Sequence, residues 1–131
     1  MCLEVLVQLE PSAKAPIGSP SLRAASEFAI RRVKFGGRTA FHVSTDGTCS
    51  CGLLAAGCEP EGELWTFTDD ALEPLARVIE ALAAKGRNFD FLAYWPGAER
   101  PRRTEKLTAE SLARTIRMNG IRNNVLFEVR T

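Results

Sequence analysis

The expected architecture rests on residues 69–95, which read DDALEPLARVIEALAAKGRNFDFLAYW. Leucine, valine and isoleucine recur at helical spacing through its first part, which predicts a long amphipathic helix that starts at Asp69 or Asp70. Pro74 falls near the first turn, where a missing N–H is least harmful, and a basic last turn followed by glycine closes the helix. Residues 88–95 are apolar at nearly every position, which is typical of a central strand.

The rest of the chain adds strands and two further helices around this pair. Alternation and helical spacing predict strands at 2–9, 38–45, 48–54, 64–68 and 124–130, and helices at 21–32 and between Thr108 and Gly120. The resulting order is β-α-β-β-β-α-β-α-β. We therefore predict one α+β domain over residues 1–131, a mixed sheet of five to six strands with three helices on one face. A doubly wound arrangement of the C-terminal half is the competing architecture.

The composition is that of an ordinary globular protein. Of the 131 residues, 45% are hydrophobic and 25% are charged, which is enough to build a core without disulfides and excludes a disordered chain. No apolar stretch approaches the length of a membrane span, and no secretory signal precedes the first strand. We therefore expect a cytoplasmic protein whose four cysteines are reduced.

The charges are balanced overall but unevenly distributed. The net charge is +1, which is too small to direct the whole molecule to nucleic acid or to an anionic membrane. Eight acidic residues against one arginine lie in the segment 46–80, whereas arginine and lysine outnumber glutamate in the segment 97–131. Such an acidic middle and basic end often arise by chance in surface loops, so this distribution alone does not indicate a partner.

Residues 42–51, HVSTDGTCSC, hold the one histidine and two of the four cysteines. Their central Asp-Gly pair is a strong hairpin signal, and the type of turn decides which side chains share a face. With a two-residue turn, His42, Cys49 and Cys51 lie on one face, and Cys58 or Asp46 supplies a fourth ligand to a site suited to zinc. A cysteine nucleophile that uses the histidine as its base requires the same register.

A three-residue turn changes the register and separates polar from apolar side chains. Phe41, Val43, Cys49 and Cys51 then form one apolar face, while His42 lies on the polar face at a solvent-exposed edge. This cleaner separation favours core cysteines, which need no chemistry. We therefore expect no cofactor, and keep zinc or thiol chemistry at the histidine and cysteines as the alternative.

A second group of candidate residues follows the apolar strand. Tyr94 and Trp95 end that strand, and the long loop after them carries Arg100, Arg102 and Arg103. Long loops at the carboxyl ends of strands often bind ligands, and guanidinium groups bind phosphate or carboxylate through paired N–H donors. We therefore expect an anionic small molecule at these five residues. The alternative is a solvated loop with the tryptophan packed in the core.

Catalytic and nucleotide-binding motifs are absent from the sequence. It contains no P-loop and no G-x-G-x-x-G, G-x-S-x-G or H-E-x-x-H pattern, and a Ser-His-Asp site would have to use His42. We therefore expect a non-catalytic binding or interaction domain and not an enzyme. Its partner is expected to be an anionic small molecule or a protein, with a sheet edge or a helix face available for a homodimer; nucleic acid and membrane are not expected.

Overall fold

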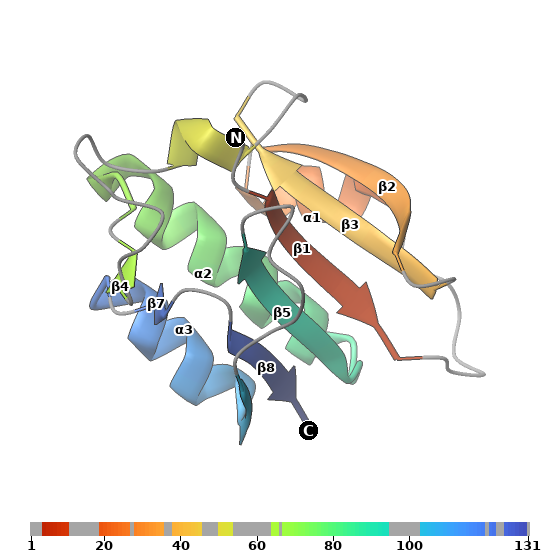
Figure 1. The fold of residues 1–131 in the computed structure, drawn as a ribbon. Coiled ribbons are helices and arrows are strands. Elements are labelled where there is room, and N and C mark those ends of the chain that lie inside the picture. Colours follow the sequence, from red (N-terminus) through yellow and green to blue (C-terminus); the bar gives the residue numbers. More distant parts are fainter. Residues whose placement is uncertain are drawn as a thin grey trace.

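Six strands form the main sheet in the computed structural model of the chain, and three helices pack on one face of that sheet (Figure 1). The strands are β1 (Glu4–Leu9), β2 (Ala29–Phe35), β3 (Arg38–Ser44), β5 (Phe89–Tyr94), β6 (Arg103–Leu107) and β8 (Val125–Val129). Their spatial order is β2-β3-β1-β5-β8-β6, and every neighbouring pair is antiparallel except β6 with β8. The structure describes residues 4–10, 19–26, 28–35, 38–45, 50–53, 64–65, 67–94, 103–119, 121–122 and 125–130.

Helices, a 3-10 turn and a short second sheet complete the described part of the chain. The helices are α1 (Ser19–Ser26), α2 (Asp69–Ala84) and α3 (Ala109–Arg117), and the 3-10 turn is η1 (Ser50–Leu53). The second sheet pairs β4 (Leu64–Trp65) with β7 (Ile121–Arg122). None of these helices combines the length and the apolar character that a bilayer crossing requires.

One hydrophobic core lies between the main sheet and the helices. Alternate residues of β1, β3, β5 and β8 face it, together with one side of each helix. Its largest fully buried side chains are Phe41, Phe67, Phe89, Phe91, Leu22, Leu53, Leu75, Ile79, Leu82 and Leu112. Because α2 and α3 share this core on one face of the sheet, the predicted single-domain α+β architecture and order of elements are confirmed, and the doubly wound alternative is wrong.

The two C-terminal helices form for the reasons that the sequence indicated. The Thr108 hydroxyl caps α3 by accepting a hydrogen bond from the N–H of Ser111 at 3.1 Å. Gly86, with φ of 68°, follows the end of α2, and Asn119, with φ of 57°, follows the end of α3. Only glycine and, less often, asparagine adopt this left-handed conformation at low cost, so both helices end where these residues stand.

The predicted helix at residues 21–32 is only half right. α1 ends at Ser26, and from Ala29 onward the chain is strand β2, which pairs with β3 over seven residues. Ile30 enters the core while Arg31 and Arg32 are exposed, as expected of an edge strand. The apolar residues at 29 and 30 continue a helical stripe by spacing alone, but hydrogen bonding to β3 decides the conformation.

Two further assignments need correction. The predicted strand at 48–54 is contradicted over its described part, because residues 50–53 form η1. β3 already has β2 on one side and β1 on the other, so no free edge remains to pair with another strand. The predicted loop at 96–106 ends earlier than expected, because residues 103–107 form β6 parallel to β8. β6 is an edge strand with mostly polar side chains, which resembles a loop in sequence.

A surface ion cluster joins α2 to α3. The Arg117 guanidinium donates to the Glu73 carboxylate at 2.8 and 2.9 Å and to the Glu80 carboxylate at 2.8 and 3.2 Å. The hydrogen bonds from Arg117 are the main cause that holds the pKa of Glu73 below its ordinary value. The bonds to Glu73 and Glu80 in turn raise the pKa of Arg117. The cluster therefore ties the two helices together by charge above their shared core.

The lowered pKa of Glu73 predicts a loss of stability in acid. The cluster stabilises the fold above the pKa of the unfolded chain, and this contribution is lost as the pH falls through the lower pKa of the folded state. Between about pH 7 and about pH 3, the urea midpoint of the wild type should therefore fall further than that of Glu73→Gln. Glu110→Gln, which removes an exposed partner of Arg114, should behave as the wild type does. Equal acid sensitivity of the wild type and Glu73→Gln would contradict this assignment.

Candidate functional site

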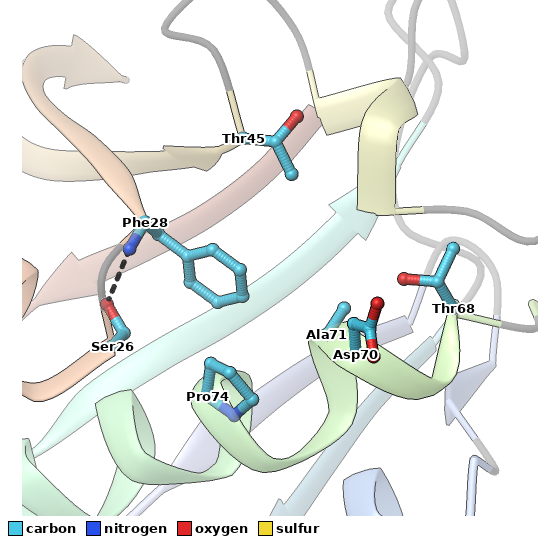
Figure 2. Close-up of a pocket in the computed structure, with 7 residues that line it drawn as sticks. All are labelled: Ser26, Phe28, Thr45, Thr68, Asp70, Ala71 and Pro74. Carbon is cyan, nitrogen blue, oxygen red and sulfur yellow. Dashed lines mark hydrogen bonds between the residues drawn. The ribbon is translucent and has the colours of Figure 1, made fainter.

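An open pocket of about 430 Å³ lies where α1, β2, β3 and α2 converge (Figure 2). Its lining comes from the end of α1, the start of β2, the residue after β3 and the first turns of α2. The residues are Ser26, Phe28, Thr45, Thr68, Asp70, Ala71 and Pro74. The phenyl ring and the side chains of Ala71 and Pro74 supply apolar groups, and the Thr68 hydroxyl and the Asp70 carboxylate supply polar groups (Figure 2).

The turn between α1 and β2 fixes one wall of the pocket. The Ser26 hydroxyl donates to the carbonyl of Leu22 at 2.8 Å and accepts from the N–H of Phe28 at 3.3 Å. Because the serine is itself buried, these bonds hold the chain as it leaves the helix and direct the phenyl ring towards the pocket (Figure 2). The ring is only 8% exposed, so it is both core and pocket wall.

The first turn of α2 supplies the opposite wall. The N–H of Thr68 donates to the carbonyl of Leu53 at 2.9 Å, and its carbonyl accepts from the N–H of Ala71 at 3.0 Å. Thr68 occupies the N-cap position, but its hydroxyl makes no capping hydrogen bond. That hydroxyl is therefore not required to hold the helix end, and it points towards the pocket, whereas Thr45 turns its methyl group in that direction (Figure 2).

The described part of the pocket lining carries a negative charge. Asp70 is exposed in the first turn of α2, beside Asp69, which does not line the pocket. No lysine, arginine or histidine is among the described residues of the lining. Free N–H groups at a helix start attract negative charge, but here the two carboxylates of the protein already supply it. The described lining is therefore suited to a hydrogen-bond donor or a cation and not to an anion.

The structure does not test the predicted anion site. Trp95, Arg100 and Arg102 lie outside the described residues, and of Tyr94 only the backbone position at the end of β5 is described. Arg103 is exposed at the start of β6, and its guanidinium contacts the Glu105 carboxylate at 2.9 Å. An anion site at these five residues therefore stays a prediction.

The sequence predicted His42 at a solvent-facing edge, but the structure buries it inside the sheet. β3 lies inside the sheet, and the imidazole is 2% exposed on the face opposite the core. Its Nε2 contacts the Glu4 carboxylate and lies 3.5 Å from the Ser50 hydroxyl. Its Nδ1 has no hydrogen-bond partner within the part of the chain that the structure describes. The prediction failed because β1, which pairs with β3 at His42 and so removes the free edge, is remote in sequence.

The contact between Ser50 and His42 does not have the geometry of a catalytic triad. The Ser50 hydroxyl donates to the carbonyl of Val43 and accepts from the N–H of Val5 at 2.9 Å, so its proton is already committed to the backbone. In a triad the acid holds Nδ1 and leaves Nε2 for the serine, whereas here both groups meet Nε2. Ser50 is also fully buried, and its role is to bridge β1 and β3.

The zinc alternative loses the hairpin on which it was built. β3 pairs with β2 and β1, and residues 50–53 form η1, so the described residues include no strand that pairs with β3 as such a hairpin requires. Cys49 and Cys58 lie outside the described residues, Cys51 is described only by its backbone in η1, and the described residues contain no cluster able to hold a metal. Metal or thiol chemistry with His42 stays a prediction. Elemental analysis of protein purified without chelator or affinity tag, combined with thiol counting before and after unfolding, tests it.

Sequence reasoning missed the pocket itself. Ser26 and Phe28 fell inside the predicted helix at 21–32, and Thr45 was placed in a strand. Only the predicted start of α2 near Asp70 gave a local signal, and it indicated a helix end rather than a site. The chain also offers no relative to guide the search, because no protein-family model, curated protein or solved structure matches it.

Proposed function

We propose that the protein is a binding domain for a small organic cation, held in the pocket between α1, β2, β3 and α2. The observation that carries this proposal is the chemistry of the lining: apolar side chains, the Thr68 hydroxyl and the Asp70 carboxylate, with no base among the described residues. An amine attached to a small apolar group satisfies all of these features at once. Asp70 is the counter-ion, and Phe28, Ala71 and Pro74 contact the apolar part.

The size of the pocket supports this proposal. A volume of about 430 Å³ lies in the lower part of the range of small-molecule sites, roughly 300–1,000 Å³. Such sites combine apolar walls with a few convergent polar groups, which is the composition of this lining. Phe28 also supplies an aromatic ring to the lining, and the face of such a ring attracts a cation.

We propose binding and not catalysis at this pocket. The Ser26 hydroxyl donates to Leu22 and accepts from Phe28, so it is not an activated nucleophile. Thr45 and Thr68 have no histidine or lysine beside them among the described lining residues. The one ionisable group of that lining is Asp70, which is exposed and serves better as a charge partner than as a general base.

Thermal stabilisation by benzylamine tests the proposal, with benzoate as a probe of matched shape and opposite charge. Benzylamine should raise the melting temperature of the wild type, and Asp70→Asn should remove most of that rise. Asp69→Asn is the matched control, because it removes the same charge from the same helix turn without touching the pocket. Equal loss in both variants would show that helix charge and not the pocket is responsible, and no stabilisation by any amine would contradict the proposal.

The same assay separates this pocket from the basic loop. Stabilisation by benzoate or phosphate that disappears when Arg100, Arg102 and Arg103 are all replaced by alanine would place the ligand site in the loop and would make the ligand an anion. Stabilisation by benzylamine that survives this triple substitution and fails in Asp70→Asn supports the pocket.

A further inference from the structure

The edge strand β2 carries the largest group of unpaired cations among the described residues. Arg31, Arg32 and Lys34 are exposed on β2, and Arg23 is exposed on α1, which packs beside it. None of these four side chains has a hydrogen bond or ion pair within the described part.

Most other described arginines of the protein have acidic partners. The described pairs are Arg77 with Glu73, Arg103 with Glu105, Arg114 with Glu110, Arg117 with Glu73 and Glu80, and Arg130 with Asp90. The contrast indicates that the positive charge along β2 is not neutralised from within the described chain. A partner of opposite charge would therefore find these cations available.

The backbone along β2 is available as well. In β3 the carbonyl of Val43 points towards β1, since it accepts from the Ser50 hydroxyl that also binds the N–H of Val5. Because backbone groups alternate in direction along a strand, the N–H and C=O groups of His42 and Ala40 must then point towards β2. Their partners on β2 are Arg31 and Val33. The N–H and C=O groups of residues 30, 32 and 34 consequently point away from β3, towards the open edge of the sheet.

We propose that β2 accepts an extended acidic segment of another protein as an additional strand of the sheet. Main-chain hydrogen bonds to residues 30, 32 and 34 supply affinity, as in other cases of strand addition. Carboxylates at alternating positions of the added strand face Arg32 and Lys34 on one side of the sheet, and Arg31 faces the other side. The pattern of charge selects the partner, and the free backbone defines its conformation.

The same charges argue against two other occupants. Pairing β2 of one copy with β2 of a second copy brings arginine and lysine opposite one another, which destabilises a homodimer through this edge. Single-stranded nucleic acid requires aromatic side chains for stacking, and the side chains described on α1, β2 and β3 include no exposed aromatic ring. Only a peptide strand can pair with the whole row of free backbone N–H and C=O groups along β2.

Charged edge strands also serve simply to prevent aggregation, so the test must measure strand addition and not charge alone. The probe is a capped, fluorescently labelled peptide of alternating glutamate and valine. Its controls are the lysine–valine counterpart, the same glutamate–valine peptide N-methylated at alternate residues to block main-chain hydrogen bonds, and oligo-dT. The protein is used as the full chain.

We expect the glutamate–valine peptide alone to bind. Its affinity should fall by about tenfold in Arg32→Glu/Lys34→Glu and stay within about twofold in Lys106→Glu, which reverses one charge on the opposite edge strand β6. On binding, the amides of Arg32 and Lys34 should become protected from hydrogen exchange. No binding, equal binding of the N-methylated peptide, equal loss in Lys106→Glu, or binding of oligo-dT in place of the peptide would each overturn the proposal.

Discussion

Ser50→Ala is expected to lower the free energy of unfolding by about 2–4 kcal/mol, although it removes a single oxygen atom. The hydroxyl accepts from the N–H of Val5 and donates to the carbonyl of Val43, and both strands are buried at this point. Val5 and Val43 would face each other directly if the β1–β3 ladder continued beyond Leu6 and His42. Without the hydroxyl, one buried donor and one buried acceptor lose their partner, and each such loss costs about 1–3 kcal/mol.

Urea denaturation of Ser50→Ala and Ser111→Ala measures this effect. Ser111 is only partly buried on α3, and its hydroxyl makes no described hydrogen bond, so its variant should differ from the wild type by less than about 0.5 kcal/mol. A Ser50→Ala variant as stable as the Ser111→Ala variant would show that β1 and β3 close directly on each other. The bridge assigned to Ser50 would then be wrong.

Phe28→Ala is expected to destabilise the fold by about 3 kcal/mol and to abolish binding in the pocket. The ring is 8% exposed and belongs to the hydrophobic core, so its removal leaves a cavity that the surrounding elements fill only in part. The same ring forms a wall of the pocket between Ser26 and Pro74 (Figure 2). Stability and binding therefore depend on one side chain, which separates this position from ordinary core positions.

A second substitution distinguishes the two roles of Phe28. Phe28→Leu keeps most of the buried volume, so it should cost about half as much stability, while the loss of the aromatic ring should still weaken binding of benzylamine. Leu75→Ala is the control for the core alone, because Leu75 is fully buried and does not line the pocket. Benzylamine binding by folded Phe28→Leu that equals that of the wild type would remove the ring from the site.

The fold could largely be predicted because its signals are local. The helix at Asp69–Ala84, its glycine end and the alternation of β1 and β8 are each specified within a few residues. The failures occur where tertiary contacts decide. Ala29 and Ile30 fit a helical stripe, yet pairing with β3 makes them a strand, and β6 has too few apolar residues to be recognised beside a parallel neighbour.

The candidate site could not be predicted for a related reason. Its lining residues extend from Ser26 to Pro74, over more than a third of the 131-residue chain, and none of them carries a motif. His42 illustrates the same limit: whether a strand lies at an edge or inside a sheet depends on strand order, which neighbouring residues do not encode. Asp70 was visible in sequence only as a helix-start residue, and its place on a pocket wall follows from how α1 and β2 pack against α2.

A titration with benzylamine, followed by the amide shifts of isotopically labelled protein, tests the central claim most directly. The pocket predicts shifts that saturate and that gather at Phe28, Thr45, Thr68 and Asp70, with matching loss of those shifts in Asp70→Asn. Residues on the far strands β6 and β8 should remain unmoved. Shifts that are absent, or that gather on β6 and the segment before it, would contradict the assignment of the pocket as the binding site.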